Sequence, residues 1–210
     1  TVTNMKSTFI DLIYPHMCTV CGEIISGGCL CGECERKILS EFCGGVSENG
    51  ALYVIPYRSD EVKKIVFAMK RTRNRELFAF AAHLCAESLR SRLPNADKYT
   101  LTYLPRRLSN RLSEGVDQSE MLARTAAHEL GLPFAKLLSR KPFTLEQKNL
   151  GAAERAENVS GIFTAKVGSV PKNVIIIDDV TTTGSSLLSA AKALHSCGAE
   201  SVVLFAFAGR

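Results

Sequence analysis

Hydrophobic and polar positions along the chain form short apolar runs and longer stretches in which apolar residues recur at helical spacing. The short runs predict four strands, at residues 51–57, 99–104, 174–177 and 201–207. The longer stretches predict helices at residues 60–93 with a break near 72–74, at 119–130 and at 187–197. Strands that alternate with helices predict an α/β fold, in which helices flank a mainly parallel sheet.

The first 48 residues have a different character. Six of the eight cysteines lie between Cys18 and Cys43, in a segment rich in glycine and poor in large apolar residues. Such a segment cannot bury a core of its own and needs another source of stability. We therefore expect two domains: a short amphipathic helix with a cysteine-rich segment in residues 1–48, and a larger domain in residues 49–210.

The cysteines of this segment predict a metal site. Two Cys-x-x-Cys pairs supply four thiolates, at Cys18, Cys21, Cys31 and Cys34. Four thiolates in a tetrahedral array form a closed, structural Zn²⁺ site. The alternatives are two disulfides or a redox pair, although a redox pair usually stands at the start of a helix, which the pattern does not predict here. Cys29 or Cys43 could replace one ligand; otherwise Cys43, Cys85 and Cys197 are expected to be small buried side chains.

Composition narrows the class of protein only a little. Apolar residues make up 46% and charged residues 22% of the chain, as in ordinary globular proteins. No apolar run approaches the roughly 20 residues of a membrane-spanning helix. The N-terminus lacks the pattern of a signal peptide, so we expect a cytoplasmic protein without a membrane span. The net charge of +5 suits anionic small molecules or weak nucleic-acid contact, and equally a solvated surface.

The candidate chemistry lies where the third strand ends. Four aliphatic residues run into Asp178 and Asp179, and a polar stretch then leads into a helix near Ser186. Open α/β sheets bind ligands at the carboxyl ends of their strands, and a helix N-terminus favours an anion. The expected anion-binding residues are Thr182, Thr183, Gly184, Ser185 and Ser186. The two carboxylates repel phosphate, so we expect them to accept sugar hydroxyls or to reach Mg²⁺ through water.

The alternative interpretation is an ordinary strand-to-helix turn with a capped helix, although paired acids beside an anion nest exceed what capping needs.

The stretch 174–186 resembles the phosphoribosyl pyrophosphate signature of type I phosphoribosyltransferases. The chain as a whole resembles the ComF family, which is associated with competence and DNA uptake. That resemblance rests on the two cysteine pairs, on residues 65–70 and 103–107, on Gly115-Val-Asp-Gln118, and on residues 147–155. It implies a type I phosphoribosyltransferase-like sheet flanked by helices, with a small zinc-ribbon-like N-terminal segment.

The implied reaction is displacement of pyrophosphate from phosphoribosyl pyrophosphate in the presence of Mg²⁺. We assign Arg106, Arg107 and Lys70 to the leaving pyrophosphate, because its charge must be neutralised. As it departs, positive charge builds on the ribose, where Asp178 and Asp179 could stabilise it. Residues 141–158 are polar and predict a long loop, from which Lys148 and Arg155 could close over the ligand. The alternative for these two is a pair of solvated charges.

The acceptor of the phosphoribosyl group is not identified by any residue. In purine-salvage relatives an acidic residue at the position of Thr182 serves the acceptor base, and the threonine argues against that subclass. The competing hypothesis is a protein that senses phosphoribosyl pyrophosphate, or binds single-stranded DNA or competence proteins, without catalysis. A redox-switched scaffold is a third. The basic stretch 63–75 is the candidate for polyanion contact, and a solvated helix face is the alternative there.

Overall fold

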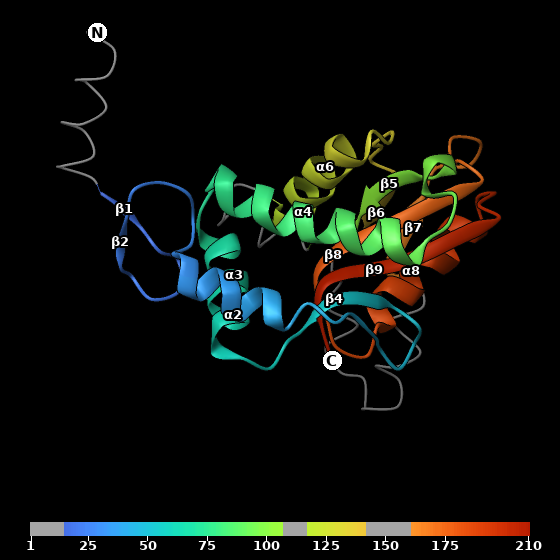
Figure 1. Cartoon of the computed structure of the whole chain (residues 1–210). Helices are drawn as coiled ribbons and strands as arrows, with labels where there is room; N and C mark the ends of the chain where they lie inside the picture. The colour runs from blue at the N-terminus through green and yellow to red at the C-terminus, as the bar shows by residue number, and fades with distance from the viewer. Residues whose placement is uncertain (1–14, 107–116, 142–160) are drawn as a thin grey trace, which may run out of the picture.

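The central element of the computed structural model is a five-stranded sheet with the order β3-β4-β9-β8-β5 (Figure 1). The structure describes residues 15–106, 117–141 and 161–210. The five strands are, in spatial order, Gly45–Val46, Leu52–Pro56, Ser201–Gly209, Asn173–Thr181 and Thr100–Tyr103. Strands β4, β9, β8 and β5 run parallel, and β3 pairs with β4 in the antiparallel direction. The carboxyl ends of the parallel strands therefore meet at one edge of the sheet.

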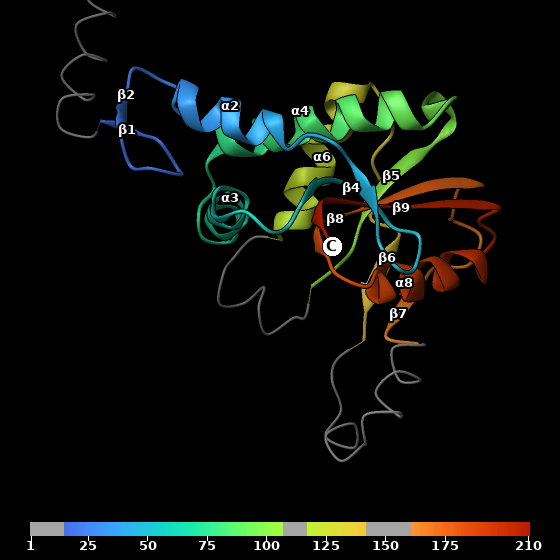
Figure 2. The ribbon, with the colours of Figure 1, turned by 60° about the horizontal axis from the view of Figure 1, so that its bottom comes forward.

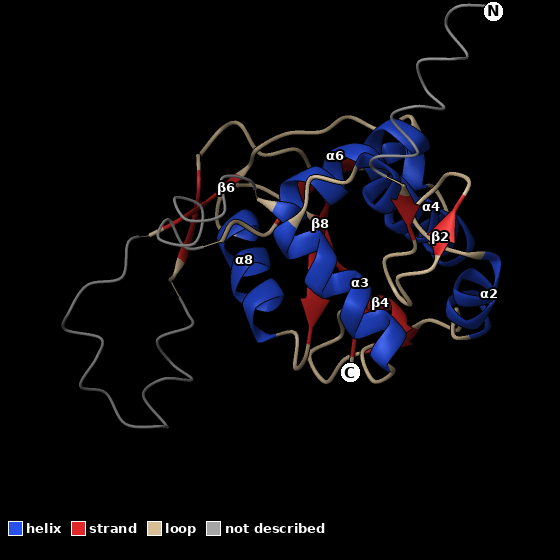
Figure 3. Ribbon diagram, turned by 90° about the vertical axis from the view of Figure 1, so that its left-hand side faces the viewer, coloured by secondary structure: helices blue, strands red, loops and turns tan. Residues whose placement is uncertain are grey.

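Helices cover both faces of this sheet. They are α2 (Gly32–Ser40), α3 (Asp60–Arg71), α4 (Arg75–Arg92), the 3₁₀ turn η1 (Ala96–Lys98), α6 (Gln118–Leu130) and α8 (Ser185–His195). Figure 2 shows α2, α4 and α6 on one side of the sheet and α8 on the other, and Figure 3 shows α4 and α8 on opposite sides of β8. Two small antiparallel pairs complete the described residues: β1 (His16–Met17) with β2 (Ile24–Ile25), and β6 (Leu138–Arg140) with β7 (Phe163–Ala165).

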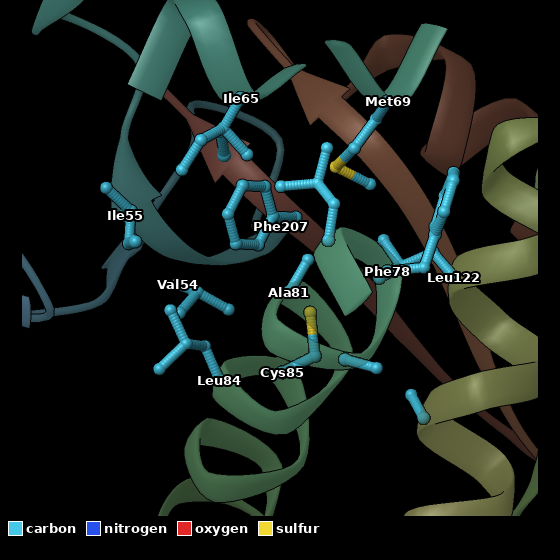
Figure 4. Packing of buried hydrophobic residues seen from close by; sticks show 14 of the residues in the cluster. Val54, Ile55, Ile65, Met69, Phe78, Ala81, Leu84, Cys85, Leu122 and Phe207 are labelled. Carbon is cyan, nitrogen blue, oxygen red and sulfur yellow. The ribbon is translucent and has the colours of Figure 1, made fainter. Parts of the chain in front are cut away.

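The alternation of side chains along the inner strands divides the core in two. On β8, Ile175 and Ile177 join the larger cluster, whereas Val174 and Ile176 join a smaller cluster beside α8. The larger cluster packs Phe207 against α3 and α4, and Figure 4 shows this ring among side chains of both helices. The aliphatic residues 174–177 of β8 are thus buried on both faces of the sheet, as their sequence predicted.

Local signals set the helix boundaries. The break between α3 and α4 falls where Asn74 caps α4, because its side-chain oxygen accepts hydrogen bonds from the N–H groups of Glu76 and Leu77. Helix α6 ends at Gly131, which takes the left-handed conformation at φ 68°. The predicted interruption near residues 72–74 and the predicted end of the helix before Gly131 are both confirmed.

The short strands β1, β2, β3, β6 and β7 were not predicted, and two larger features also differ from the sequence prediction. Helix α2 was not predicted, because the glycine and cysteine content of that segment hides a short amphipathic pattern in which Cys34 and Ile38 face the core. Strand β8 runs past the two aspartates to Thr181, because β9 continues to pair with it as far as Gly209. None of the helices in the described ranges is both long and apolar enough to cross a bilayer.

Candidate active site and four-cysteine cluster

The extended β8 leaves a connection of three residues before α8: Thr182, Thr183 and Gly184. Thr182, Thr183 and Ser186 are exposed, and Ser185 is half-buried. The hydroxyl oxygens of Thr183 and Ser185 lie 2.8 Å apart at the beginning of α8. The first N–H groups of a helix have no acceptor within the helix, so this turn presents backbone and hydroxyl donors together. Such a turn can hold a phosphate group; we call residues 182–186 the phosphate loop.

Gly184 is required at its position in this loop for two reasons. Its φ of 82° lies in the left-handed region, which side chains disfavour. A Cβ atom there would also lie 2.7 Å from the Ser47 hydroxyl oxygen. The loop therefore packs tightly against the turn that precedes β4.

The two aspartates that follow the aliphatic stretch have different surroundings. Asp178 accepts hydrogen bonds from the Ser119 hydroxyl at 2.8 Å and from the Asp179 N–H at 2.9 Å. Burial, and then the neighbouring Asp179 carboxylate, raise the pKa of Asp178 well above its usual range. Asp178 is therefore oriented by α6, a contact that the sequence pattern did not reveal.

Asp179 is the member of the pair that contacts cations. Its side chain is only 7% exposed, and one carboxylate oxygen lies 2.5 Å from the Arg106 guanidinium and 3.8 Å from the Lys70 ammonium. The other oxygen accepts the Val180 N–H at 2.9 Å. Residues predicted separately to bind pyrophosphate and sugar thus come together at one point.

The start of α6 supports the same corner. Asp117 accepts the Arg106 N–H at 3.2 Å and caps α6 through the Glu120 N–H at 3.4 Å. Gln118 donates to the Lys70 carbonyl oxygen at 3.0 Å. The segment after β5, the end of α3 and the start of α6 are therefore linked around the acid pair.

A cavity of about 320 Å³ lies beside Arg106. It is lined by Tyr103, Pro105, Arg106, Lys136, Leu138, Ser139 and Arg140. Lys136 pairs with Glu120 at 2.7 Å, and the Arg140 guanidinium lies 5.3 Å from the centre of the Phe163 ring. Lys136 and Arg140 were missed by sequence reasoning, because they become neighbours of Arg106 only when residues 133–135 align beside β5.

Three predicted residues, Arg107, Lys148 and Arg155, lie outside the described residues.

The four predicted metal ligands form a cluster at the other end of the chain. The sulfur atoms of Cys18, Cys21, Cys31 and Cys34 all lie within 4.8 Å of one another. A tetrahedral Zn²⁺ site with Zn–S bonds of about 2.3 Å separates its sulfurs by about 3.8 Å. The Cys21 and Cys31 sulfurs lie 3.7 Å apart, so the four thiols fit Zn²⁺. Burial opposes the thiolate of Cys18, but N–H groups of neighbouring residues, chiefly Cys21, lower its pKa to about 6.

Two expectations about the cysteines need correction. Cys31 occupies the N-cap position of α2 and Cys34 lies in its first turn, so a Cys-x-x-Cys pair does stand at the start of a helix. The neighbouring strands form a small antiparallel hairpin rather than a thioredoxin-like unit, and the four-sulfur cluster favours a metal. Cys85 is buried as expected, but Cys43 is exposed and Cys197 is half-buried. Cys29 is buried near the cluster without joining it.

Comparison with known proteins finds a matching family model, two relatives and a similar solved structure. Residues 117–210 match the phosphoribosyl transferase domain family. The DNA utilization protein YhgH of Salmonella typhi is 31% identical over 144 residues, which cover 66% of this chain and 63% of that protein. Competence protein F of Haemophilus influenzae is 23% identical over 210 residues, which cover 91% of this chain and 90% of that protein. The adenine phosphoribosyltransferase structure of Leishmania tarentolae aligns at 21% identity and TM-score 0.40, covering 71% of this chain and 75% of that chain.

Residues 117–210 therefore resemble a phosphoribosyltransferase domain, and the mixed sheet and flanking helices of the chain agree with the fold expected from its sequence. The matched region includes the acid pair, the phosphate loop and the start of α6. Together with the cysteine cluster and the two curated relatives, this domain fits a ComF-like protein.

Proposed function

We propose that the protein binds phosphoribosyl pyrophosphate and transfers its phosphoribosyl group to an acceptor. The supporting observation is the convergence of three kinds of group at the carboxyl edge of the parallel sheet. Around the end of β8 lie, one after another in space, a turn suited to an anion, a pair of carboxylates and two cationic side chains. The substrate has a phosphate, a diol and a pyrophosphate in the same order.

The phosphate loop accepts the 5′-phosphate in this proposal. Its hydroxyls and the first N–H groups of α8 donate to the phosphate oxygens, and the helix dipole stabilises the negative charge. The carboxylates of Asp178 and Asp179 accept hydrogen bonds from the ribose hydroxyls. No carboxylate faces the phosphate in this arrangement.

Binding of pyrophosphate requires a change of partners at Asp179. Without substrate, Arg106 and Lys70 neutralise this buried carboxylate. A pyrophosphate that enters beside Arg106 offers these cations a more highly charged partner, and Asp179 is then released toward the sugar. Lys136 and Arg140, which line the neighbouring cavity, add positive charge on the same side.

The same residues assist departure of the leaving group. The C1–O bond to pyrophosphate breaks while the acceptor forms its bond to C1, and Arg106 and Lys70 hold the charge that develops on pyrophosphate. Positive charge on the ribose is stabilised by the aspartates. Mg²⁺ that accompanies the substrate supplies further neutralisation of the pyrophosphate oxygens. Lys148 and Arg155 close over the ligand in this proposal.

We place this reaction in the cytoplasm and connect it with DNA. Four thiolates that hold Zn²⁺ persist in a reducing compartment. The relatives are named for competence and for DNA utilization, so the acceptor or a partner belongs to DNA uptake or use.

Calorimetric titration of the zinc-loaded chain with phosphoribosyl pyrophosphate and Mg²⁺ tests the proposal. Replacement of both acids, Asp178→Asn with Asp179→Asn, should abolish most of the affinity while a phosphate-loop contact remains. Asp97→Asn is a matched control, because Asp97 is exposed in η1. This turn precedes the start of β5, whereas the candidate site lies at the carboxyl ends of the strands. Release of pyrophosphate with candidate amines or nucleobases then tests catalysis. Wild-type protein that takes up no phosphoribosyl pyrophosphate would refute the proposal.

A non-catalytic role in binding single-stranded DNA is the second candidate, favoured by the exposed face of α3. Phe67 is 56% exposed, and the Arg71 guanidinium lies 4.5 Å from its ring centre. An exposed ring beside a cation is a stacking platform for an unpaired base. Fluorescence anisotropy with a labelled oligonucleotide tests this candidate. Phe67→Ala should weaken binding. If Phe67→Ala and Arg71→Ala both bind the oligonucleotide as tightly as the wild type, α3 is excluded as the binding surface.

A further inference from the structure

The turn that precedes β4 packs against the phosphate loop from behind. We call residues 47–51 the supporting turn. The Ser47 N–H donates to the Ala51 carbonyl at 2.8 Å, and the Ala51 N–H donates back to the Ser47 hydroxyl oxygen at 3.1 Å. Ser47 is buried and Asn49 is half-buried. The conformation of the supporting turn is thus held by its own hydrogen bonds, independently of its contacts with the phosphate loop.

Asn49 makes three hydrogen bonds from this turn to the phosphate loop. Its backbone N–H donates to the Thr183 carbonyl at 3.0 Å, and its side-chain amide donates to the same oxygen at 2.8 Å. The side-chain amide also donates to the Ser185 hydroxyl oxygen at 3.3 Å. A carbonyl oxygen can only accept, so the nitrogen of the Asn49 amide must face Thr183.

These bonds determine the direction of one backbone donor. In a planar trans peptide the C=O and the following N–H point in opposite directions. The Thr183 carbonyl points toward the supporting turn, so the Gly184 N–H points away from it. The bond to Ser185 acts in the same sense, because a hydroxyl that accepts from Asn49 donates its own proton elsewhere, either to the Thr183 hydroxyl 2.8 Å away or to a ligand.

We propose that Asn49 is a positioning residue, which orients the phosphate loop to receive a phosphomonoester. The inference rests on the proposed function, since it concerns the loop assigned there to the 5′-phosphate. Asn49 precedes the residues that match the phosphoribosyl transferase family and is far from the loop in sequence. It acts through Thr183 and Ser185 and needs no contact with the substrate.

Two probes separate positioning from general support of the fold. Ribose 5-phosphate reports on the phosphate loop, whereas pyrophosphate with Mg²⁺ reports on the side of Arg106. Both are titrated by calorimetry into the full chain with bound zinc. Asn49→Ala loses two side-chain hydrogen bonds but keeps the backbone bond, so ribose 5-phosphate should bind roughly tenfold more weakly. The affinity for pyrophosphate with Mg²⁺ should stay within about twofold of the wild-type value.

Asn49→Asp provides a second variant of the same size, which keeps the test open if Asn49→Ala does not fold. Its carboxylate faces the Thr183 carbonyl and adds negative charge behind the loop, so ribose 5-phosphate should bind more weakly than to Asn49→Ala. Glu48→Gln is the matched control, because Glu48 is exposed in the same turn. It should leave both affinities unchanged.

The outcomes distinguish this inference from the proposed function. Unchanged ribose 5-phosphate binding in both Asn49 variants would overturn the positioning role and leave the proposed function standing. Equal weakening of both probes would also overturn it, because a merely structural effect is not selective. If wild-type protein binds neither probe, the proposed function fails and the positioning role fails with it.

Discussion

The contact between Arg106 and Asp179 makes a quantitative prediction about stability. Arg106→Met removes the guanidinium but keeps much of the apolar stem, and it leaves the buried Asp179 carboxylate with Lys70 at 3.8 Å. Breaking a fully buried ion pair costs about 3–5 kcal/mol, whereas an exposed pair contributes about 0–1 kcal/mol. The Arg106 side chain is 18% exposed, and Lys70 remains as a second partner. We therefore expect a loss of about 2 kcal/mol in the free energy of unfolding.

Urea denaturation of a double-mutant cycle measures this interaction. For a chain of this size, about 2 kcal/mol corresponds to a melting temperature about 4–8 °C lower. Asp179→Asn removes the buried charge, so Arg106→Met should cost about 1–2 kcal/mol less in that background than in the wild type. Arg124→Met is the matched control, because Arg124 is 54% exposed beside Glu120. Additive effects of the two single changes would refute the reasoning.

Three further predictions concern other parts of the molecule. Elemental analysis of protein purified under reducing conditions should find one zinc per chain. The variant Cys18→Ser should lose the zinc and thermal stability, whereas Cys43→Ser, at an exposed cysteine outside the cluster, should retain both. Because the folded protein raises the pKa of Asp178, its ionisation destabilises the fold as pH rises above the usual carboxyl range. Asp178→Asn should therefore stabilise the protein at pH 8 and lose this advantage as the pH falls to the usual carboxyl range, and an advantage independent of pH in denaturation experiments would contradict this assignment. Gly184→Ala should cost about 1–2 kcal/mol of stability from its left-handed φ and weaken ribose 5-phosphate binding; unchanged melting would argue against the tight packing on Ser47.

The sequence pattern was sufficient for the larger part of the sheet and its helices. The aliphatic run before Asp178 predicted a doubly buried strand, and Gly131 predicted the end of α6. The hydrophobic pattern did not predict the strand boundaries that are determined by pairing between strands. Strand β8 extends to Thr181 because β9 is long enough to pair with it, and β3 exists because β4 offers an edge. Neither strand has a local signal that marks these residues.

Candidate site residues could be proposed from the sequence where they are continuous along the chain. The aspartates and the phosphate loop form one stretch, so a hypothesis about their chemistry could be drawn from the sequence alone. The contacts of Ser119 with Asp178, and of Asn49 with Thr183, join elements that are distant in sequence. Serine and asparagine are common in turns and caps, so nothing in their local sequence separates these two from ordinary surface residues.

The edge strand β3 has a consequence for dividing the chain into pieces. Arg92 of α4 donates to the carbonyl oxygens of Tyr53 and Gly45, and so fastens this edge to the helical layer. A shortened polypeptide starting at residue 49 would lack β3 and the Ser47 hydroxyl against which Gly184 packs. The cysteine-rich segment and the part that resembles a phosphoribosyltransferase therefore cannot be exchanged independently, and a chimera between relatives should place its junction upstream of Gly45.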